Sequence, residues 1–184
     1  GVDKASIGLF AYVALPYSFN FVWAPLVDHL SIPYLTNKLG RRRSWMVVSQ
    51  LAVMVSLFWF STLNPFEAPV SVAIAAILVA FFSASQDIVI DAFRTEYLDK
   101  DQYGEGAAVA VFGYRLGMLV AGAGALYLAG SQGWGITYGA MSLCMLVGLV
   151  TILIAREPND SFKEPDFENP EGWLKHAVID PFAD

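Results

Sequence analysis

Long runs of apolar residues constrain this chain more than any other feature of its sequence. Five stretches of apolar character follow one another along the 184 residues, and they cover 6–27, 44–63, 68–93, 104–129 and 135–155. A helix rises about 1.5 Å per residue, so about 20 residues cross the roughly 30 Å hydrocarbon core of a bilayer. The sequence therefore predicts an all-α, polytopic membrane protein with five transmembrane helices. Pro16 and Pro25 are expected to kink the first of them.

Composition and charge agree with a lipid environment and exclude several functions. Only 15% of the residues are charged, where a soluble domain usually carries roughly 25%. The formal net charge of -6 argues against nucleic acid as a partner, because phosphate binding needs a basic surface. The single cysteine, Cys144, builds neither a disulfide framework nor a cysteine-based zinc site. With no nucleophile–base pair or metal-ligand set in the spans, we expect no enzyme activity, no metal and no cofactor.

The basic residues predict how the chain crosses the membrane. Lys38 and the arginines at 41–43 lie in the first connection, and Arg94 and Lys100 lie in the third, whereas the second and fourth hold none. Short cytoplasmic loops carry the excess of Lys and Arg, so the start of the chain is predicted to be periplasmic. Residues 156–184, rich in acidic residues and proline, are predicted to be a cytoplasmic linker. The chain is interpreted as a piece of a longer reading frame, unstable without the remaining helices.

Three charged residues in the third apolar stretch are predicted to share one helix face. At about 100° per residue, Asp87, Asp91 and Arg94 fall within a narrow sector. Exposing such a charge to hydrocarbon costs on the order of 2.5 to 3.5 kcal/mol, so this face should meet protein or a water-filled cavity. Two carboxylates one turn apart repel each other, which favours proton binding by one of them. Either they serve proton coupling, or Asp91 and Arg94 in particular lock neighbouring helix ends by ion pairs.

The fourth stretch combines a smooth glycine ridge with one arginine. Gly106, Gly113, Gly117 and Gly124 recur at helical spacing, a pattern typical of closely packed membrane helices. Arg115 lies about 160° to 200° away from Gly113 and Gly117 around the helix. It is therefore expected to point into a polar cavity, where it would contact substrate; the alternative is a buried structural ion pair. In the first stretch, Tyr17 either lines a pathway or hydrogen-bonds between helices.

Four segments carry a resemblance to a known family. They are SASQDIVIDAFRTE (83–96), GYRLGML (113–119), FVWAPLVD (21–28) and GRRRSW (40–45). Together they resemble the AmpG muropeptide permeases, a branch of the major facilitator superfamily, and the similarity extends over residues 5–155. The first two segments are specific to that branch and its acetyl-CoA transporter relatives.

The resemblance implies an architecture and an activity. The five spans would be helices two to six of a twelve-helix carrier, that is, its N-terminal half without the first helix. Family members resemble proton-driven importers of anhydromuropeptides that work by alternating access in the bacterial inner membrane. The expected partners are the lipid bilayer, protons and a sugar–peptide anion, and the full-length protein is expected to be monomeric. Two alternatives remain: a carrier of another anion such as acetyl-CoA, and a membrane sensor or scaffold that transports nothing.

The charge pattern and the resemblance together suggest roles for individual residues. Proton coupling is assigned to Asp87 and Asp91. Substrate binding is assigned to Arg115, Gln86 and Tyr114. A cytoplasmic gate is assigned to Asp28, Arg41, Arg42, Arg94 and Glu96. The superfamily's usual loop pattern, Asp-Arg-x-Gly-Arg followed by Lys or Arg, is interrupted here, because Asp28 is followed by His29 and eleven further residues before Arg41.

Overall fold

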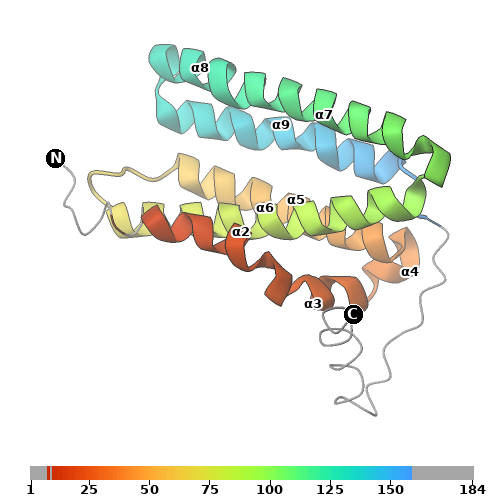
Figure 1. Ribbon diagram of the computed structural model, residues 1–184. Helices are drawn as coiled ribbons and strands as arrows, with labels where there is room; N and C mark the ends of the chain where they lie inside the picture. Colours follow the sequence, from red (N-terminus) through yellow and green to blue (C-terminus); the bar gives the residue numbers. More distant parts are fainter. Residues whose placement is uncertain (1–7, 9, 159–184) are drawn as a thin grey trace.

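The computed structural model describes residue 8 and residues 10–158, and all regular secondary structure in this part of the chain is helical (Figure 1). Four of its helical stretches are long and apolar enough to cross a membrane. They are α5 (Arg41–Ser61), α6 (Pro69–Tyr97), the continuous stretch Lys100–Gln132 and α9 (Trp134–Ile154). The prediction of an all-α membrane protein is confirmed. Of the linker predicted over 156–184, all but residues 156–158 lies outside the described residues.

The stretch Lys100–Gln132 changes its helix type along its length without a break. It consists of η3 (Lys100–Gln102), α7 (Tyr103–Leu119), the π-helical turn η4 (Val120–Gly124) and α8 (Ala125–Gln132). Gly133, with φ of 85°, then reverses the chain into α9. A positive φ at this point suits glycine, which has no Cβ to clash with the backbone.

The first predicted span differs from a single helix over 6–27. The chain instead forms a series of short segments: η1 (Phe10–Ala14), α2 (Leu15–Phe19), η2 (Asn20–Val22) and α3 (Ala24–His29). Pro16 and Pro25 each lie in the first turn of a new α-helix, in α2 and α3 respectively. Proline has no backbone N–H to continue a preceding helix but is tolerated in a first turn. The two prolines therefore divide this segment, and α4 (Leu35–Leu39) follows before α5.

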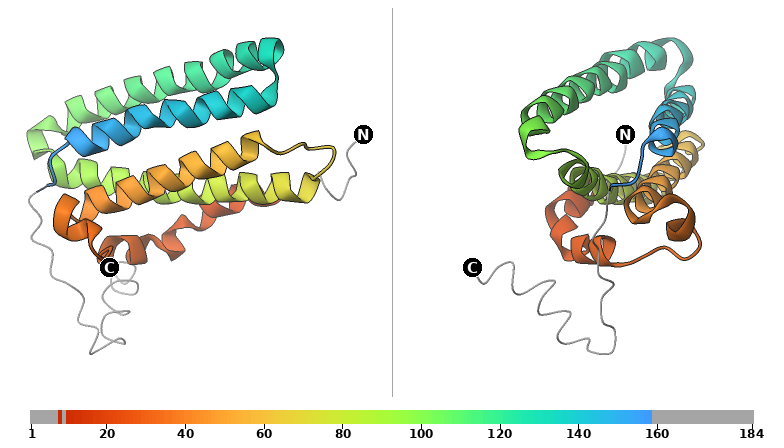
Figure 2. Two further views of the ribbon diagram at one scale, coloured as in Figure 1. Left: turned by 180° about the vertical axis from the view of Figure 1, so that it is seen from behind. Right: turned by 90° about the vertical axis from the view of Figure 1, so that its right-hand side faces the viewer.

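The helices pack around α5, which lies between α6 and α9 (Figure 2). A buried apolar cluster joins these elements to α3 through Val27, Met46, Val47, Val89 and Ile152. In contrast, α7 contacts mainly the turns at its own two ends, and Figure 2 shows it diverging from α9 with distance from α8. In the most apolar part of each span, 39% of α5 is buried inside the protein, whereas only 6% of the stretch that contains α7 is buried.

Candidate functional site

The polar face of α6 is formed as the helical spacing predicts, but its members have different partners. Arg94 pairs with Asp91, with 3.0 Å between Nη2 and Oδ1; the Asp91 side chain is largely exposed and that of Arg94 is partly exposed. Asp87, one turn away, is also exposed and forms no hydrogen bond or ion pair with any residue that the structure describes. Asp87 is therefore the carboxylate of this face that is not held by a neighbouring cation.

Tyr17 approaches this face from α2. Its hydroxyl interacts with the side chain of Ser83 and lies within range of the charge on Asp87. Tyr17 and Ser83 also line an open pocket of about 320 Å³ between the first segments, α5, α6 and α9, to which α9 contributes Tyr138. The hydroxyl groups of Tyr17 and Ser83 are therefore polar neighbours of Asp87 beside a pocket whose other lining residues are mostly apolar.

A second group of charges, the α5 charge cluster, consists of Asp28, Arg41, Arg42, Glu96 and Glu157. Arg42 is its centre and is only 6% exposed. Its Nη1 lies 2.5 Å from Oδ1 of Asp28, and its Nε donates to both carboxylate oxygens of Glu96 at 2.9 and 3.1 Å. Arg41 lies 3.8 Å from Glu96 and donates to the backbone carbonyl of Asp28. The cluster joins the ends of α3, α5 and α6.

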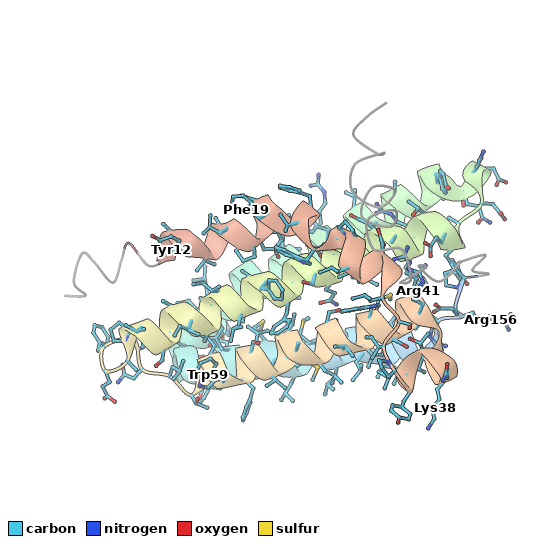
Figure 3. The ribbon with its side chains drawn as sticks, turned by 90° about the horizontal axis from the view of Figure 1, so that it is seen from below. Tyr12, Phe19, Lys38, Arg41, Trp59 and Arg156 are labelled. Carbon is cyan, nitrogen blue, oxygen red and sulfur yellow. The ribbon has the colours of Figure 1, made fainter. Side chains whose placement is uncertain are left out.

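Four of the five residues predicted as a gate thus come together, whereas the fifth, Arg94, pairs with Asp91 instead. Figure 3 shows Arg41 at the same end of the bundle as Lys38 and Arg156, away from Tyr12 and Trp59. All these basic residues therefore lie at one end of the helices.

Glu157 is a member of the α5 charge cluster that the sequence reasoning missed. Its carboxylate accepts hydrogen bonds from the backbone N–H groups of Arg42, at 2.7 Å, and Arg43, at 3.1 Å. These donors lie in the first turn of α5, where the N-cap residue is Gly40 and offers no side chain. An acidic group satisfies free N–H groups at a helix start and complements the helix dipole. The sequence alone predicts a solvated linker at Glu157, because nothing local connects it to residue 42.

Arg43 caps the end of α9 in turn. Its Nε donates to the carbonyl of Ile152 at 3.0 Å, and its Nη2 donates to the carbonyl of Leu153 at 2.8 Å. The last carbonyls of a helix lack partners within the helix, and a basic side chain can satisfy them. The start of α5 and the end of α9 therefore cap each other.

Gln86, predicted as a substrate contact, lies inside a hydrogen-bonded bridge between helices. Its Nε2 donates to Oε1 of Gln50, and Nε2 of Gln50 donates to the carbonyl of Met145 at 2.5 Å. Gln50 is 2% exposed. Gly148 makes room for it, because a Cβ there would lie 2.6 Å from the Gln50 amide nitrogen. Sequence reasoning missed Gln50, whose only signal was an amide within an otherwise apolar run.

The candidates on α7 are separated from these groups. Arg115 and Tyr114 are exposed, and Arg115 has no hydrogen bond or ion pair within the part of the chain that the structure describes. A Cβ added at Gly113 or Gly117 would meet nothing within 4 Å, and one at Gly124 would meet only the carbonyl of Leu119. Gly106, in contrast, packs against Leu98. The roles of Arg115, Tyr114 and the glycine ridge remain predictions.

No group of three His, Cys, Asp or Glu side chains within residues 8 and 10–158 is arranged to hold a metal ion. The candidate site therefore consists of Asp87 with its neighbours on α6, the α5 charge cluster, and the exposed face of α7.

Comparison with known proteins places this arrangement in a family. The model of the Major Facilitator Superfamily matches residues 1–183. The chain is 38% identical over all its 184 residues to the anhydromuropeptide permease of Escherichia coli K12, of which it covers 35%. It is 36% identical over its full length to a putative transporter, AmpG 4, of Rickettsia felis, of which it covers 44%. Over 83% of its length it is 42% identical to an uncharacterized protein of Haemophilus influenzae.

The chain spans between about a third and a half of the length of these relatives. The family match covers nearly every residue, and the membrane-capable helices are those expected of a multi-pass membrane protein. The predicted relationship is confirmed: the chain belongs to the Major Facilitator Superfamily.

Proposed function

We propose that the protein containing this chain is a secondary active transporter that imports anhydromuropeptides across the bacterial inner membrane. The observation that carries the proposal is the 38% identity, over the whole chain, to a protein named anhydromuropeptide permease. In this proposal the start of the chain is periplasmic, and the α5 charge cluster lies at the cytoplasmic end of the bundle. The two halves of the full-length protein alternate access to a site between them.

Asp87 is proposed as the proton-binding group. A coupling residue must change its charge when a proton binds, so it cannot be permanently held by a cation. Asp91 is paired with Arg94, whereas Asp87 has no such partner in the described chain and lies beside the hydroxyl of Tyr17. Protonation removes a charge from the α6 face, and this change would couple proton entry to movement of the helices.

Arg115 is proposed to bind the solute. An anhydromuropeptide carries peptide carboxylates, and a guanidinium group binds a carboxylate through two parallel hydrogen bonds. The exposed position of Arg115 on α7, without an ion pair among the residues the structure describes, supports this role. The α5 charge cluster would hold α3, α5 and α6 together as one unit during gating.

Uptake by cells tests the proposal. Cells expressing the complete reading frame are given a labelled disaccharide anhydromuropeptide, with and without a protonophore, beside cells with Asp87→Asn. We expect uptake that collapses with the protonophore and with the substitution. A correctly inserted protein that takes up no muropeptide would overturn the assignment of the solute. Competition by acetyl-CoA would then identify the alternative cargo, and absence of any transport would identify a sensor or scaffold.

A further inference from the structure

Three consecutive polar residues of α6 point in three directions. Ser85 accepts a hydrogen bond from Nε1 of Trp23, at 3.1 Å, on the side of the first segments. Gln86 donates to Gln50 on the side of α5, and Asp87 points to the exposed face. Successive residues of a helix are rotated by about 100°, so each contact defines a direction around the α6 axis. The rotation of α6 that satisfies Ser85 and Gln86 also determines where Asp87 points.

Apolar packing alone leaves this rotation weakly defined. The buried side of α6 consists mostly of small residues, including Ala73, Ala75, Ala80 and Ala84. In a membrane, apolar contacts between helices compete with equally apolar lipid, so directional hydrogen bonds contribute more to helix arrangement. Small side chains also make a smooth surface over which a helix can turn. The polar contacts of residues 85 and 86 therefore fix the rotation in the middle of α6, and the ion pair of Glu96 with Arg42 fixes it at the end of the helix.

Gln50 is placed to act as the anchor of this arrangement. It is buried in α5, accepts from Gln86 of α6 and donates to Met145 of α9. Both ends of its amide are thus used, and each end reaches a different helix. An unsatisfied buried amide is costly, so the bridge favours the one orientation in which all its groups are paired.

We propose that Gln50 is a positioning residue for Asp87: by holding Gln86, it fixes the rotation of α6 and therefore the face on which Asp87 is presented. The proposal rests on the proposed function, since Asp87 is taken there as the proton-binding group. It assigns to Gln50 no contact with proton or solute. Losing the anchor should uncouple transport from the proton gradient while the carrier still exchanges solute.

A matched control is available at the same helix interface. Ser142 of α9 is also buried and donates to the carbonyl of Met54 in α5 at 2.9 Å. Ser142→Ala therefore removes a hydrogen bond between α5 and α9 without touching α6, whereas Gln50→Leu removes the bridge to α6 as well. Gly148→Ala is a second test variant, because the added methyl group displaces the Gln50 amide without deleting it.

The first measurement compares two modes of transport by the complete permease in proteoliposomes. Gln50→Leu is expected to lower uptake driven by a proton gradient about tenfold, the equivalent of one buried hydrogen bond. Solute counterflow, which requires no net proton movement, is expected to stay within about twofold of the unmodified protein. Gly148→Ala should have the same effect as Gln50→Leu, lowering driven uptake more than counterflow. Ser142→Ala should leave the ratio of driven uptake to counterflow unchanged.

The second measurement reads the orientation of α6 without any transport. In a cysteine-free background of the full-length protein, Asp87→Cys and Val89→Cys are each treated with a membrane-impermeant thiol reagent. Position 87 is exposed and position 89 fully buried, so the first should react much faster. Adding Gln50→Leu should reduce this contrast, and adding Ser142→Ala should preserve it.

The proposal would be overturned if Gln50→Leu left the difference in labelling rate between positions 87 and 89 unchanged. It would also be overturned if Gln50→Leu lowered driven uptake and counterflow equally and Ser142→Ala did the same. If the unmodified permease transports no muropeptide, the proposed function fails, and the labelling contrast alone decides whether Gln50 positions Asp87. If Gln50→Leu does not insert, the same two readouts are applied to Gly148→Ala, with the same outcomes for and against.

Discussion

Two regions of this chain, the bundle around α5 and the exposed helix α7, differ in how far the described chain satisfies their polar groups. Around α5, each arginine at 41–43 contacts an acidic side chain or a backbone carbonyl, and Gln50 is bonded at both ends. On α7, Arg115 is exposed without a hydrogen bond or ion pair among the residues described, and a Cβ at Gly113 or Gly117 would meet nothing within 4 Å. Within the described residues the polar groups of the first region are largely paired, whereas those of the second are not. Substitutions in the first should therefore lower stability, with an added effect on proton coupling at Gln50 and Gly148, and substitutions in the second should act on transport.

The largest effect on stability is expected at Arg42. Arg42→Met leaves the partly exposed carboxylates of Asp28 and Glu96 without their shared cation, which is itself buried. A hydrogen bond to a charged group contributes about 1.5 to 3 kcal/mol and exposure weakens the charge term, so we expect a loss of about 3 kcal/mol. Thermal unfolding of the purified full-length protein in detergent measures the loss. The exposed Lys38 provides the control, since Lys38→Met should change stability by less than about 0.5 kcal/mol. Equal stability of the two variants would show that the α5 charge cluster is not structural.

A smaller loss is expected when Gly148 gains a methyl group. Gly148→Ala forces the Gln50 amide away from its partners, and overpacking of this kind typically costs about 1 to 3 kcal/mol. Gly139→Ala, in the same helix, meets only Ser61 Oγ at an ordinary 3.8 Å and should be tolerated. The two variants are compared by thermal unfolding, and the expected order fails if Gly139→Ala is the less stable one.

Loss of charge at Glu157 should have a modest effect. Glu157→Gln keeps an oxygen able to accept from the backbone of Arg42 or Arg43, but it removes the negative charge at the start of α5. The interaction of such a charge with a helix end is worth about 0.3 to 1 kcal/mol at low ionic strength. The destabilisation should shrink as salt is added, because the charge is screened. A loss that is independent of salt would assign it to hydrogen-bond geometry instead of charge.

At Arg115 the expected stability change is the smallest and the functional change is large. Arg115→Met removes no hydrogen bond or ion pair of the described chain from this exposed position, so the free energy of unfolding should shift by less than about 0.5 kcal/mol. Muropeptide uptake should nevertheless fall, through a raised KM if the guanidinium binds a carboxylate of the solute. Strong destabilisation with unchanged KM would instead identify Arg115 as a structural ion-pair partner in the full-length protein.

The contrast between the two regions also explains which features were predictable. Run length and periodicity indicate α5, α6 and α9, because these patterns are local and a bilayer requires helices of that length. The spacing of Asp87, Asp91 and Arg94 correctly places them on one face, and the grouping of Asp28 with Arg41 and Arg42 follows from the family resemblance. These features depend on short segments or on a known pattern.

The features that sequence reasoning missed depend on contacts between distant segments. Glu157 caps α5 through the N–H of Arg42, 115 residues before it, and Gln50 meets Gln86 and Met145 only after three helices have packed. The division of residues 6–27 into short helices has local causes in Pro16 and Pro25. Whether a proline only kinks a helix or ends it also depends on the packing around it. Gln86 is named as a solute contact on the sequence, whereas its hydrogen bond to Gln50 depends on a residue 36 positions away in another helix.

The most direct test of the account is proton-driven uptake by the Asp87→Asn variant of the full-length protein, measured in proteoliposomes beside counterflow of the same labelled anhydromuropeptide. Asparagine has nearly the shape of aspartate, but its amide does not bind and release a proton near neutral pH. We expect uptake driven by the proton gradient to be lost while counterflow persists. Driven uptake equal to that of the unmodified protein would contradict this expectation, because Asp87 would then lie outside the coupling path.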